Sequence, residues 1–213
     1  MNTAYRFLVP GLFTVALAAA WWAGGQPASA DALDDCRRVK NLEKSIAGCD
    51  RVISRWTRAS RKTRALAHER RGNAYYLKGD YPRALADAES AIKLNSKDAW
   101  AYQLRASVSF NLGKLELAEV DFGNAIRLDS SIAYFWRSRG HTFMRMGKYD
   151  EALSDLNRAI SLDPKNARNF DLRANLFEVL GRYRDALNDY KAANSLDPSL
   201  EIPDELRRFG EQE

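Results

Sequence analysis

The sequence predicts an all-α fold, a solenoid of antiparallel helix pairs, and two observations carry this prediction. A period of 34 residues repeats four times without a gap, in blocks that begin at Ala65, Ala99, Ala133 and Ala167. Within each block, large apolar and small residues recur at fixed offsets, and a glycine at the fifteenth position marks the end of the first helix. Because a lone helix pair cannot bury both of its faces, neighbouring pairs must stack on one another.

The repeated positions divide each block into two helices. Small residues recur at the eighth position, where two helices must approach closely, and alanine recurs at the twentieth and twenty-seventh positions. Leu-Asp-Pro closes the last two blocks, and proline forces the helix before it to stop. We therefore expect four repeats, over 65–98, 99–132, 133–166 and 167–200.

This pattern resembles the tetratricopeptide repeat (TPR) family, over Ala65–Leu200. The resemblance implies two antiparallel helices per repeat, stacked into a right-handed superhelix with a concave groove. The departures are local, since His68 and Ser109 replace aromatic residues and Ser96 and Ser130 replace proline. We expect His68 to be a buried or half-buried substitute for the aromatic residue.

The first 30 residues are expected to form a signal peptide of the bacterial type. They carry a single charge, Arg6, followed by an apolar run over 7–23 and small residues at Ala28 and Ala30. This order predicts cleavage after Ala30 and export of the rest of the chain, to the periplasm or by secretion. An uncleaved anchor is the alternative, because the apolar run approaches the length that spans a bilayer.

Cys36 and Cys49 are the two cysteines of the chain. In an oxidising compartment we expect them to pair in a structural disulfide, across two short antiparallel helical pieces with a turn near Asn41. A redox-active pair is the alternative, although such pairs usually have closer spacing.

Both ends of the array are expected to be capped. Ser45–Ile53 resembles Ala84–Ile92 of the first full repeat, so 31–64 is interpreted as a degenerate capping repeat held by the disulfide. At the other end, 201–213 is expected to form a C-terminal cap or tail.

An arginine at the seventh position and an aspartate at the twenty-third recur in all four blocks. We expect each arginine to bind an aspartate between packed helices through charge-assisted hydrogen bonds. A row of ligand-binding arginines is the alternative, but it leaves the repeated aspartates without a role. The predicted ion pairs are Arg71 with Asp87, Arg105 with Asp121, Arg139 with Asp155, and Arg173 with Asp189.

The resemblance implies that the first helix of each repeat lines the groove. Aromatic side chains alternate there with amide and guanidinium groups, which suits peptide recognition because it combines rigid contact area with hydrogen-bond donors. Packing between repeats is the alternative role for any one of these aromatic residues. The candidate groove residues are Asn73, Tyr76, Trp100, Gln103, Phe110, Tyr134, Arg137, His141, Met144 and Asn175, with Trp100 the strongest.

Composition and motifs argue against catalysis. The chain has 213 residues with two cysteines and two histidines, and it has no Gly-rich phosphate loop, nucleophile elbow or HExxH helix. Its formal net charge of +5 is mild and does not indicate nucleic acid. We expect no enzymatic activity, no cofactor, no metal and no nucleic-acid partner.

Some TPR proteins clamp a C-terminal carboxylate with lysine, asparagine and arginine at set positions. Of that set only Asn73 matches, because Glu69, Leu104 and Ser138 stand where cations or amides are needed. Binding of a chaperone tail through such a clamp is therefore not expected.

A basic cluster lies between Arg51 and Arg71, where eight basic residues accompany a single acid, Glu69. A solvated helix face with its linker is one interpretation, and a docking patch for an acidic protein, lipid headgroups or an acidic polymer is the other. The cluster includes Arg51, Arg55, Arg58, Arg61, Lys62 and Arg64.

The leading prediction is a non-enzymatic scaffold of the cell envelope that binds a protein or peptide in its concave groove. The alternative is a surface-associated factor whose basic cluster makes weak contact with a membrane surface or an acidic polymer, with the repeats as a spacer.

Overall fold

The structure, a computed structural model, describes residues 30–37, 41–54 and 58–204. Three predictions fall wholly or largely outside these residues: the signal peptide, Arg55 of the basic cluster, and the part of the C-terminal cap beyond Asp204. Of the helices described, none has both the length and the apolar character needed to cross a membrane.

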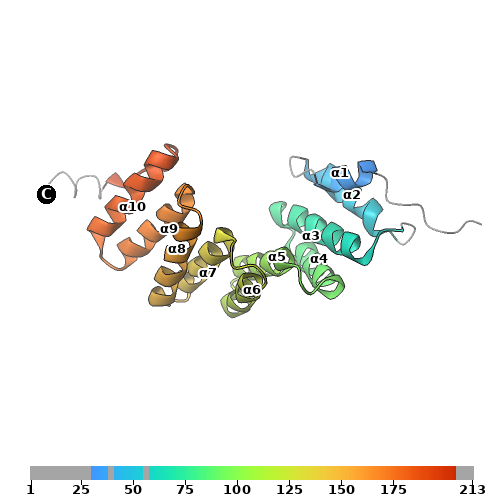
Figure 1. Ribbon diagram of the computed structural model, residues 1–213, viewed down its shortest axis with the longest axis horizontal. Coiled ribbons are helices and arrows are strands. Elements are labelled where there is room, and N and C mark those ends of the chain that lie inside the picture. Colours follow the sequence, from blue (N-terminus) through green and yellow to red (C-terminus); the bar gives the residue numbers. More distant parts are fainter. Residues whose placement is uncertain (1–29, 38–40, 55–57, 205–213) are drawn as a thin grey trace, which may run out of the picture.

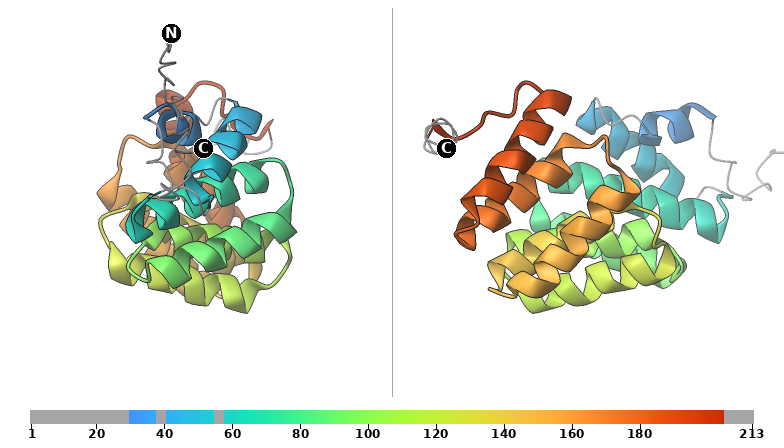
Figure 2. Two further views of the ribbon diagram at one scale, coloured as in Figure 1. Left: turned by 90° about the vertical axis from the view of Figure 1, so that its right-hand side faces the viewer. Right: turned by 60° about the vertical axis from the view of Figure 1, so that its left-hand side comes forward.

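The described residues form ten helices and no strand, arranged as successive antiparallel pairs (Figure 1). The predicted all-α solenoid is therefore confirmed. The array is curved, because the ends near α1 and α10 lie on the same side of the middle repeats in both views of Figure 2. The helices are α1 (Ala30–Arg37), α2 (Leu42–Ile53), α3 (Arg61–Leu77), α4 (Tyr81–Leu94), α5 (Ala99–Asn111), α6 (Leu115–Leu128), α7 (Ala133–Arg145), α8 (Tyr149–Leu162), α9 (Ala167–Val179) and α10 (Tyr183–Leu196).

Capping residues set where the helices begin and end. Gly79 and Gly147 follow the first helix of their repeats with φ of +76° and +74°, a left-handed conformation that only glycine adopts without strain. The side chain of Asp98 accepts a hydrogen bond from Trp100 N at 3.1 Å and so caps α5. The glycine that follows the first helix recurs in all four repeats with positive φ, whereas α6, α7, α8 and α10 have no side-chain cap.

The first repeat begins earlier than the sequence pattern indicates. The repeat was expected to start at Ala65, but α3 starts at Arg61, because Ser60 Oγ accepts from Thr63 N at 3.0 Å and caps the helix there. Arg61 then donates to the carbonyl oxygens of Lys93 and Leu94, both at 2.9 Å, at the carboxyl end of α4. These hydrogen bonds satisfy free carbonyl groups at the end of α4 and hold the extra turn of α3 in place.

Small residues let the helices approach closely. A Cβ added at Gly72 would lie 2.8 Å from Cδ2 of Leu104 on α5 and 3.0 Å from Cβ of Asp87 on α4, so a neighbouring side chain would have to shift. At Gly140 the added Cβ would lie 3.1 Å from Cγ of Leu156 on α8. At the eighth position the first helix therefore lies close to its partner helix, and at Gly72 it also lies close to the next repeat.

Arginine and aspartate join the two helices of each repeat. Each arginine donates to its aspartate from both Nε and Nη2, with the Nε to Oδ2 distance between 2.6 and 2.8 Å. The carboxylates are buried, and Asp155, for example, is 4% exposed. At Asp87, burial favours the protonated carboxyl, but hydrogen bonds from Arg71 and His68 bring its pKa below the ordinary value. His68 is half-buried, and its Nδ1 donates to this carboxylate at 2.8 Å.

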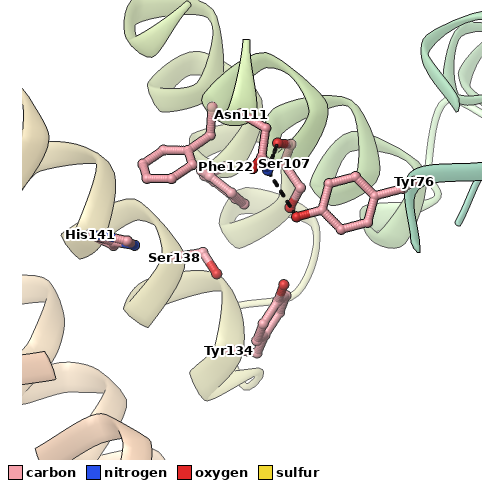
Figure 3. A pocket seen from close by; sticks show the side chains of 8 residues that line it. Tyr76, Ser107, Asn111, Phe122, Tyr134, Ser138 and His141 are labelled. Carbon is pink, nitrogen blue, oxygen red and sulfur yellow. Dashed lines mark hydrogen bonds between the residues drawn. The ribbon is translucent and has the colours of Figure 1, made fainter. Parts of the chain in front are cut away.

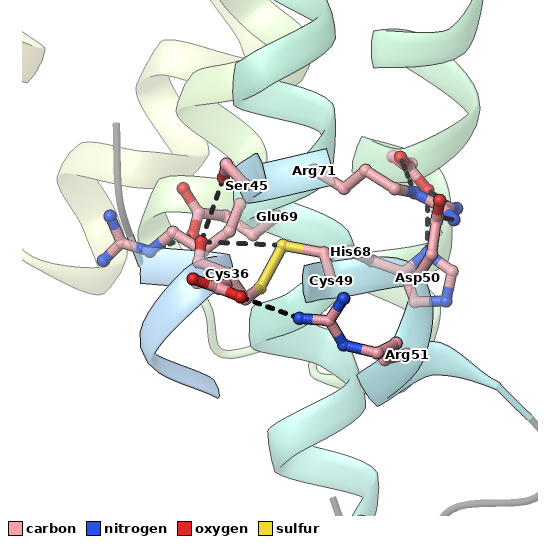
Figure 4. Close-up of a disulfide and its surroundings, with 11 residues drawn as sticks. Cys36, Ser45, Cys49, Asp50, Arg51, His68, Glu69 and Arg71 are labelled. Carbon is pink, nitrogen blue, oxygen red and sulfur yellow. Dashed lines mark hydrogen bonds and ion pairs between the residues drawn. A yellow bond between two sulfur atoms is a disulfide. The ribbon is translucent and has the colours of Figure 1, made fainter. Parts of the chain in front are cut away.

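The amino-terminal cap, formed by α1 and α2, is joined by the Cys36–Cys49 disulfide (Figure 4). Ser45 Oγ donates to the carbonyl oxygen of Cys36 at 3.1 Å, and Asn41 caps α2 by accepting from Lys44 N at 2.9 Å. Both half-cystines are buried beside Val52 and Ala67 in one apolar cluster. Burial of this kind is typical of a structural disulfide rather than of a reactive one.

Candidate functional site

The candidate site is a cavity of about 200 Å³ on the face formed by the first helices of the first three repeats (Figure 3). Cavities that hold drug-sized ligands or cofactors are larger, so this volume suits one large side chain of a bound peptide. Seven of its eight lining residues come from α3, α5 and α7. The lining residues are Tyr76, Ser107, Phe110, Asn111, Phe122, Tyr134, Ser138 and His141.

Amide and hydroxyl groups connect the three helices around the cavity. Asn111 Nδ2 donates to the Tyr76 hydroxyl of the preceding repeat at 2.9 Å. Gln103 Nε2 donates to Ser107 Oγ at 2.8 Å and to the Tyr134 hydroxyl of the following repeat at 3.3 Å. Because these bonds span repeats, they hold the rim in a fixed geometry before any ligand arrives.

An exposed aromatic wall lies beside the cavity. Trp100 is 45% exposed, yet its ring stacks on Tyr134 with centroids 6.3 Å apart and meets Phe135 edge-on at 4.9 Å. Tyr134 is itself 37% exposed, whereas Phe135 is fully buried. Trp100 therefore packs between repeats and still leaves apolar area exposed.

Arg137, His141 and Arg145 form a stripe along α7, four residues apart. Arg137 Nη1 donates to the side-chain oxygen of Asn169 at 3.1 Å and to that of Asn166 at 3.4 Å. The guanidinium of Arg145 and the ring of His141 both lie against Phe110, at 5.5 and 4.8 Å from its centroid.

Burial and neighbouring cations disfavour further positive charge along the stripe. Burial lowers the pKa of His141, and the charges of Arg145 and Arg137 lower it further. The pKa of Arg137 is also lowered, first by burial and then by Arg168. His141 is thus kept neutral at physiological pH between two guanidinium groups.

Six of the ten candidate residues do not line the cavity, and three of these six also lie away from its rim. Met144 is partly buried and packs against the core cluster around Phe143 and Leu156. Asn175 donates to the carbonyl oxygen of Asp171 at 2.7 Å and accepts from the Tyr190 hydroxyl at 3.2 Å. Asn73 faces the amino-terminal cap, in a space of only about 10 Å³. The structure therefore groups Tyr76, Phe110, Tyr134 and His141 directly, with Trp100, Gln103 and Arg137 beside them.

Four lining residues, Ser107, Asn111, Phe122 and Ser138, were not among the candidates. Phe122 belongs to the second helix of its repeat and is 2% exposed, so its sequence position indicates only a core role. Ser138 stood out only as a departure from the carboxylate clamp. Ser107 and Asn111 lie at groove positions that the resemblance implies, and that spacing was the available signal. In the described part of the chain, no group of three or more His, Cys, Asp or Glu side chains is placed to hold a metal ion.

Glu69 is a buried acid at a position where the groove was expected to be open. It is 6% exposed, and burial raises its pKa to about 7, with Asp98 acting in the same direction and Arg70 against it. The side chain contacts Arg70 Nε at 3.2 Å.

Within the described residues, several members of the basic cluster are engaged by acidic side chains or carbonyl groups. Arg51 binds Asp35 at 2.8 Å, and Arg71 binds Asp87 and Asp50. Arg61 is engaged at the carboxyl end of α4, and Arg55 lies outside the described residues. Lys62 remains exposed beside an open depression that Lys97 and Trp100 also line.

Comparison with known protein families identifies a family that matches most of the chain. A family model described as the ETO1 C-terminal domain matches residues 27–213. No curated protein sequence matches the chain at a significant level.

Solved structures of TPR proteins share the fold. MamA has a TM-score of 0.64 at 20% identity, over 78% of this chain and 95% of its own. YrrB, described as a TPR protein with an unusual peptide-binding site, has a TM-score of 0.60 at 21% identity, over 82% of this chain and 86% of its own. The first TPR domain of Spaghetti (RPAP3), bound to an HSP90 peptide, has a TM-score of 0.53 at 26% identity, over 55% of this chain and 95% of its own. The chain therefore belongs to the ETO1 C-terminal domain family and has the fold of a tetratricopeptide-repeat protein.

Proposed function

We propose that this protein-interaction scaffold binds a peptide, or an extended segment of a partner protein, across α3, α5 and α7, and that it acts in the cell envelope without catalysing a reaction. The observation that carries the proposal is the cavity beside the exposed pair of Trp100 and Tyr134. A cavity for one side chain, bordered by aromatic surface and fixed polar groups, is the composition of a peptide-binding hot spot.

The polar rim supplies what an extended backbone requires. Gln103 and Asn111 carry amide groups whose positions are fixed by bonds between repeats, and Ser138 lines the same cavity (Figure 3). A peptide laid along the face exchanges hydrogen bonds with these groups while one of its side chains enters the cavity.

Two structural neighbours support a peptide ligand. YrrB is described by its peptide-binding site, and the Spaghetti domain is described with a bound HSP90 peptide. In this chain the carboxylate-clamp positions are not matched, so the ligand proposed here differs from a chaperone tail.

The envelope location rests on the amino-terminal segment, with its single charge, apolar run and small residues before Asp31. The buried disulfide agrees with an oxidising compartment such as the periplasm or the cell exterior.

Crosslinking capture from the native envelope, followed by mass spectrometry, tests the proposal. The double variant Trp100→Ala/Tyr134→Ala is expected to lose a partner that the wild type recovers. Leu117→Ala, at a 57% exposed apolar residue on a second helix, is the matched control and should retain the partner.

Equal recovery by wild type and double variant would contradict groove binding. Loss of the partner with Arg58→Gln/Lys62→Gln instead would assign the interaction to the basic cluster, which is the alternative function.

A further inference from the structure

Arg137 differs from the repeated arginines of the array in its lack of an acidic partner. Arg71, Arg105, Arg139 and Arg173 each bind a buried aspartate through the edge formed by Nε and Nη2. Arg137 lies at the fifth position of its repeat and is half-buried. It donates through Nη1 to the amide oxygens of two asparagines, and its guanidinium carbon lies 5.1 Å from the centroid of the Tyr134 ring. Among the residues that the structure describes, its Nε and Nη2 donate to none.

The surroundings of Arg137 do not supply a counter-ion. Asp163 is close enough to act favourably on its charge, but forms no ion pair with it and instead accepts from Asn166 at 3.2 Å. Arg168 acts in the opposite direction. Burying a cation without a carboxylate is unfavourable unless a ligand completes the pair.

The rest of the groove centre is also free of acids. The groove positions of the second and third repeats carry aromatic, amide, hydroxyl, imidazole and guanidinium groups, and the cavity is lined by no Asp or Glu. Glu69 stands one repeat before this region, and Asp171 and Glu178 stand one repeat after it. Arg145 completes the positive stripe on α7 and has no ion pair within the described ranges.

We propose that the partner segment is acidic, with one carboxylate bound to the free Nε and Nη2 edge of Arg137 and a neighbouring apolar or aromatic side chain in the cavity. This inference rests on the proposed function, because it assigns a chemistry to the peptide that the groove binds. The bidentate geometry is the one that the same chain uses four times in its interior. Trp100 and Tyr134 then supply contact area to the residues that flank the carboxylate.

A phage-displayed library of random nonapeptides, selected on the purified full chain, tests the inference. The recovered pool is expected to be enriched in Asp and Glu relative to the starting library. Individual peptides are then measured by fluorescence anisotropy, and Arg137→Gln should weaken them about tenfold, the effect of one charge-assisted hydrogen bond. Arg127→Gln is the matched control, since that exposed arginine contacts only Asn124 of the same helix.

A second variant separates charge from folding. Arg145→Gln removes the other cation of the stripe without touching the asparagines that Arg137 binds, and should also weaken acidic peptides. Circular dichroism melting of both variants shows whether the helices remain intact. Binding of the acidic peptides should weaken as salt rises, because the ion pair is open to solvent on one side.

Each other outcome has a defined meaning. If the recovered peptides depend on Trp100 and Tyr134 but are neutral or basic, the acidic partner is overturned and groove binding stands. The same conclusion follows if these peptides bind the Arg137→Gln variant as tightly as they bind the wild type. If no recovered peptide depends on Trp100 or Tyr134, both proposals fail.

Two further measurements define the source of the anion. Peptides made with free and amidated carboxyl ends distinguish a terminal carboxylate from a side-chain carboxylate. Binding of phosphatidylglycerol vesicles that is lost in Arg137→Gln, with no acidic peptide bound, would assign the site to lipid and overturn the inference.

Discussion

Arg139 donates to Asp155 through two parallel hydrogen bonds, from Nε at 2.8 Å and from Nη2 at 2.9 Å. The pair joins α7 to α8, and its carboxylate is buried between them. The same contact recurs in every full repeat with the same spacing of sixteen residues. One ion pair per repeat therefore fixes how the second helix sits against the first.

Replacing Arg139 by methionine should lower the free energy of unfolding by about 3 kcal/mol, because Asp155 would remain buried without its cation. Urea denaturation followed by circular dichroism measures this change. The exposed Arg127→Met serves as the control and should stay within about 0.5 kcal/mol of wild type. The double variant Arg139→Met/Asp155→Leu should recover most of the lost stability. If Arg139→Met is as stable as the control, the ion pair does not stabilise the fold.

Two helical glycines provide a matched test of close packing. Gly72→Ala should destabilise the fold by about 1–3 kcal/mol, since the new Cβ would lie 2.8 Å from Leu104 Cδ2. At Gly123 the new Cβ would meet only the guanidinium of Arg139, at 3.7 Å. Gly123→Ala should therefore raise stability by up to about 1 kcal/mol through helix propensity. Thermal melting of both variants measures the two effects. Equal changes in melting temperature would contradict close helix packing at Gly72.

The repeat pattern predicts those features that each block carries in its own residues. The glycine that ends the first helix, the small residue where helices cross, and the arginine with its aspartate all follow from positions within one period. The cavity depends instead on how successive repeats turn relative to one another. For that reason Phe122 and Ser138, which line it, could not be selected from sequence.

Features without a counterpart in the other repeats depend on contacts that lie outside one period. Met144 occupies a groove position by spacing and is partly buried against the core cluster of Phe143. The extra turn at the start of α3 depends on contacts of Arg61 with α4, which is distant in sequence. The members of the basic cluster are close in sequence, but in the structure Arg51 binds Asp35, and Arg71 binds Asp50 and Asp87.

Glu69 should make stability depend on pH. Its pKa in the folded chain is about 7 against an ordinary value of 4.5, and a raised carboxyl pKa favours the folded state only while the group is protonated. The contribution of Glu69 to the free energy of unfolding is therefore fully present below about pH 4.5, and it is lost as the pH rises through about 7. A difference of about 2.5 units corresponds to about 3 kcal/mol at most.

Glu69→Gln removes this dependence. The variant should be more stable than wild type at pH 8, with the difference disappearing near pH 4, in urea denaturation at both values. Glu151→Gln, at an exposed position on α8, is the control and should follow wild type. Parallel profiles for wild type and Glu69→Gln would show that the carboxyl of Glu69 is ionised in the folded chain.

His141 reports the potential of the groove centre directly. Because burial and then the charges of Arg145 and Arg137 lower its pKa, the imidazole should titrate below its ordinary value of 6.5 in an NMR pH titration. Arg145→Gln should raise that pKa by removing the second-largest cause, while Arg127→Gln, on the exposed face of α6, should leave it unchanged. An acidic peptide bound in the groove should also raise it, since the added carboxylate favours the imidazolium. If the pKa of His141 does not change in Arg145→Gln, burial alone lowers it. The charge of Arg145 would then have no measurable effect on the groove.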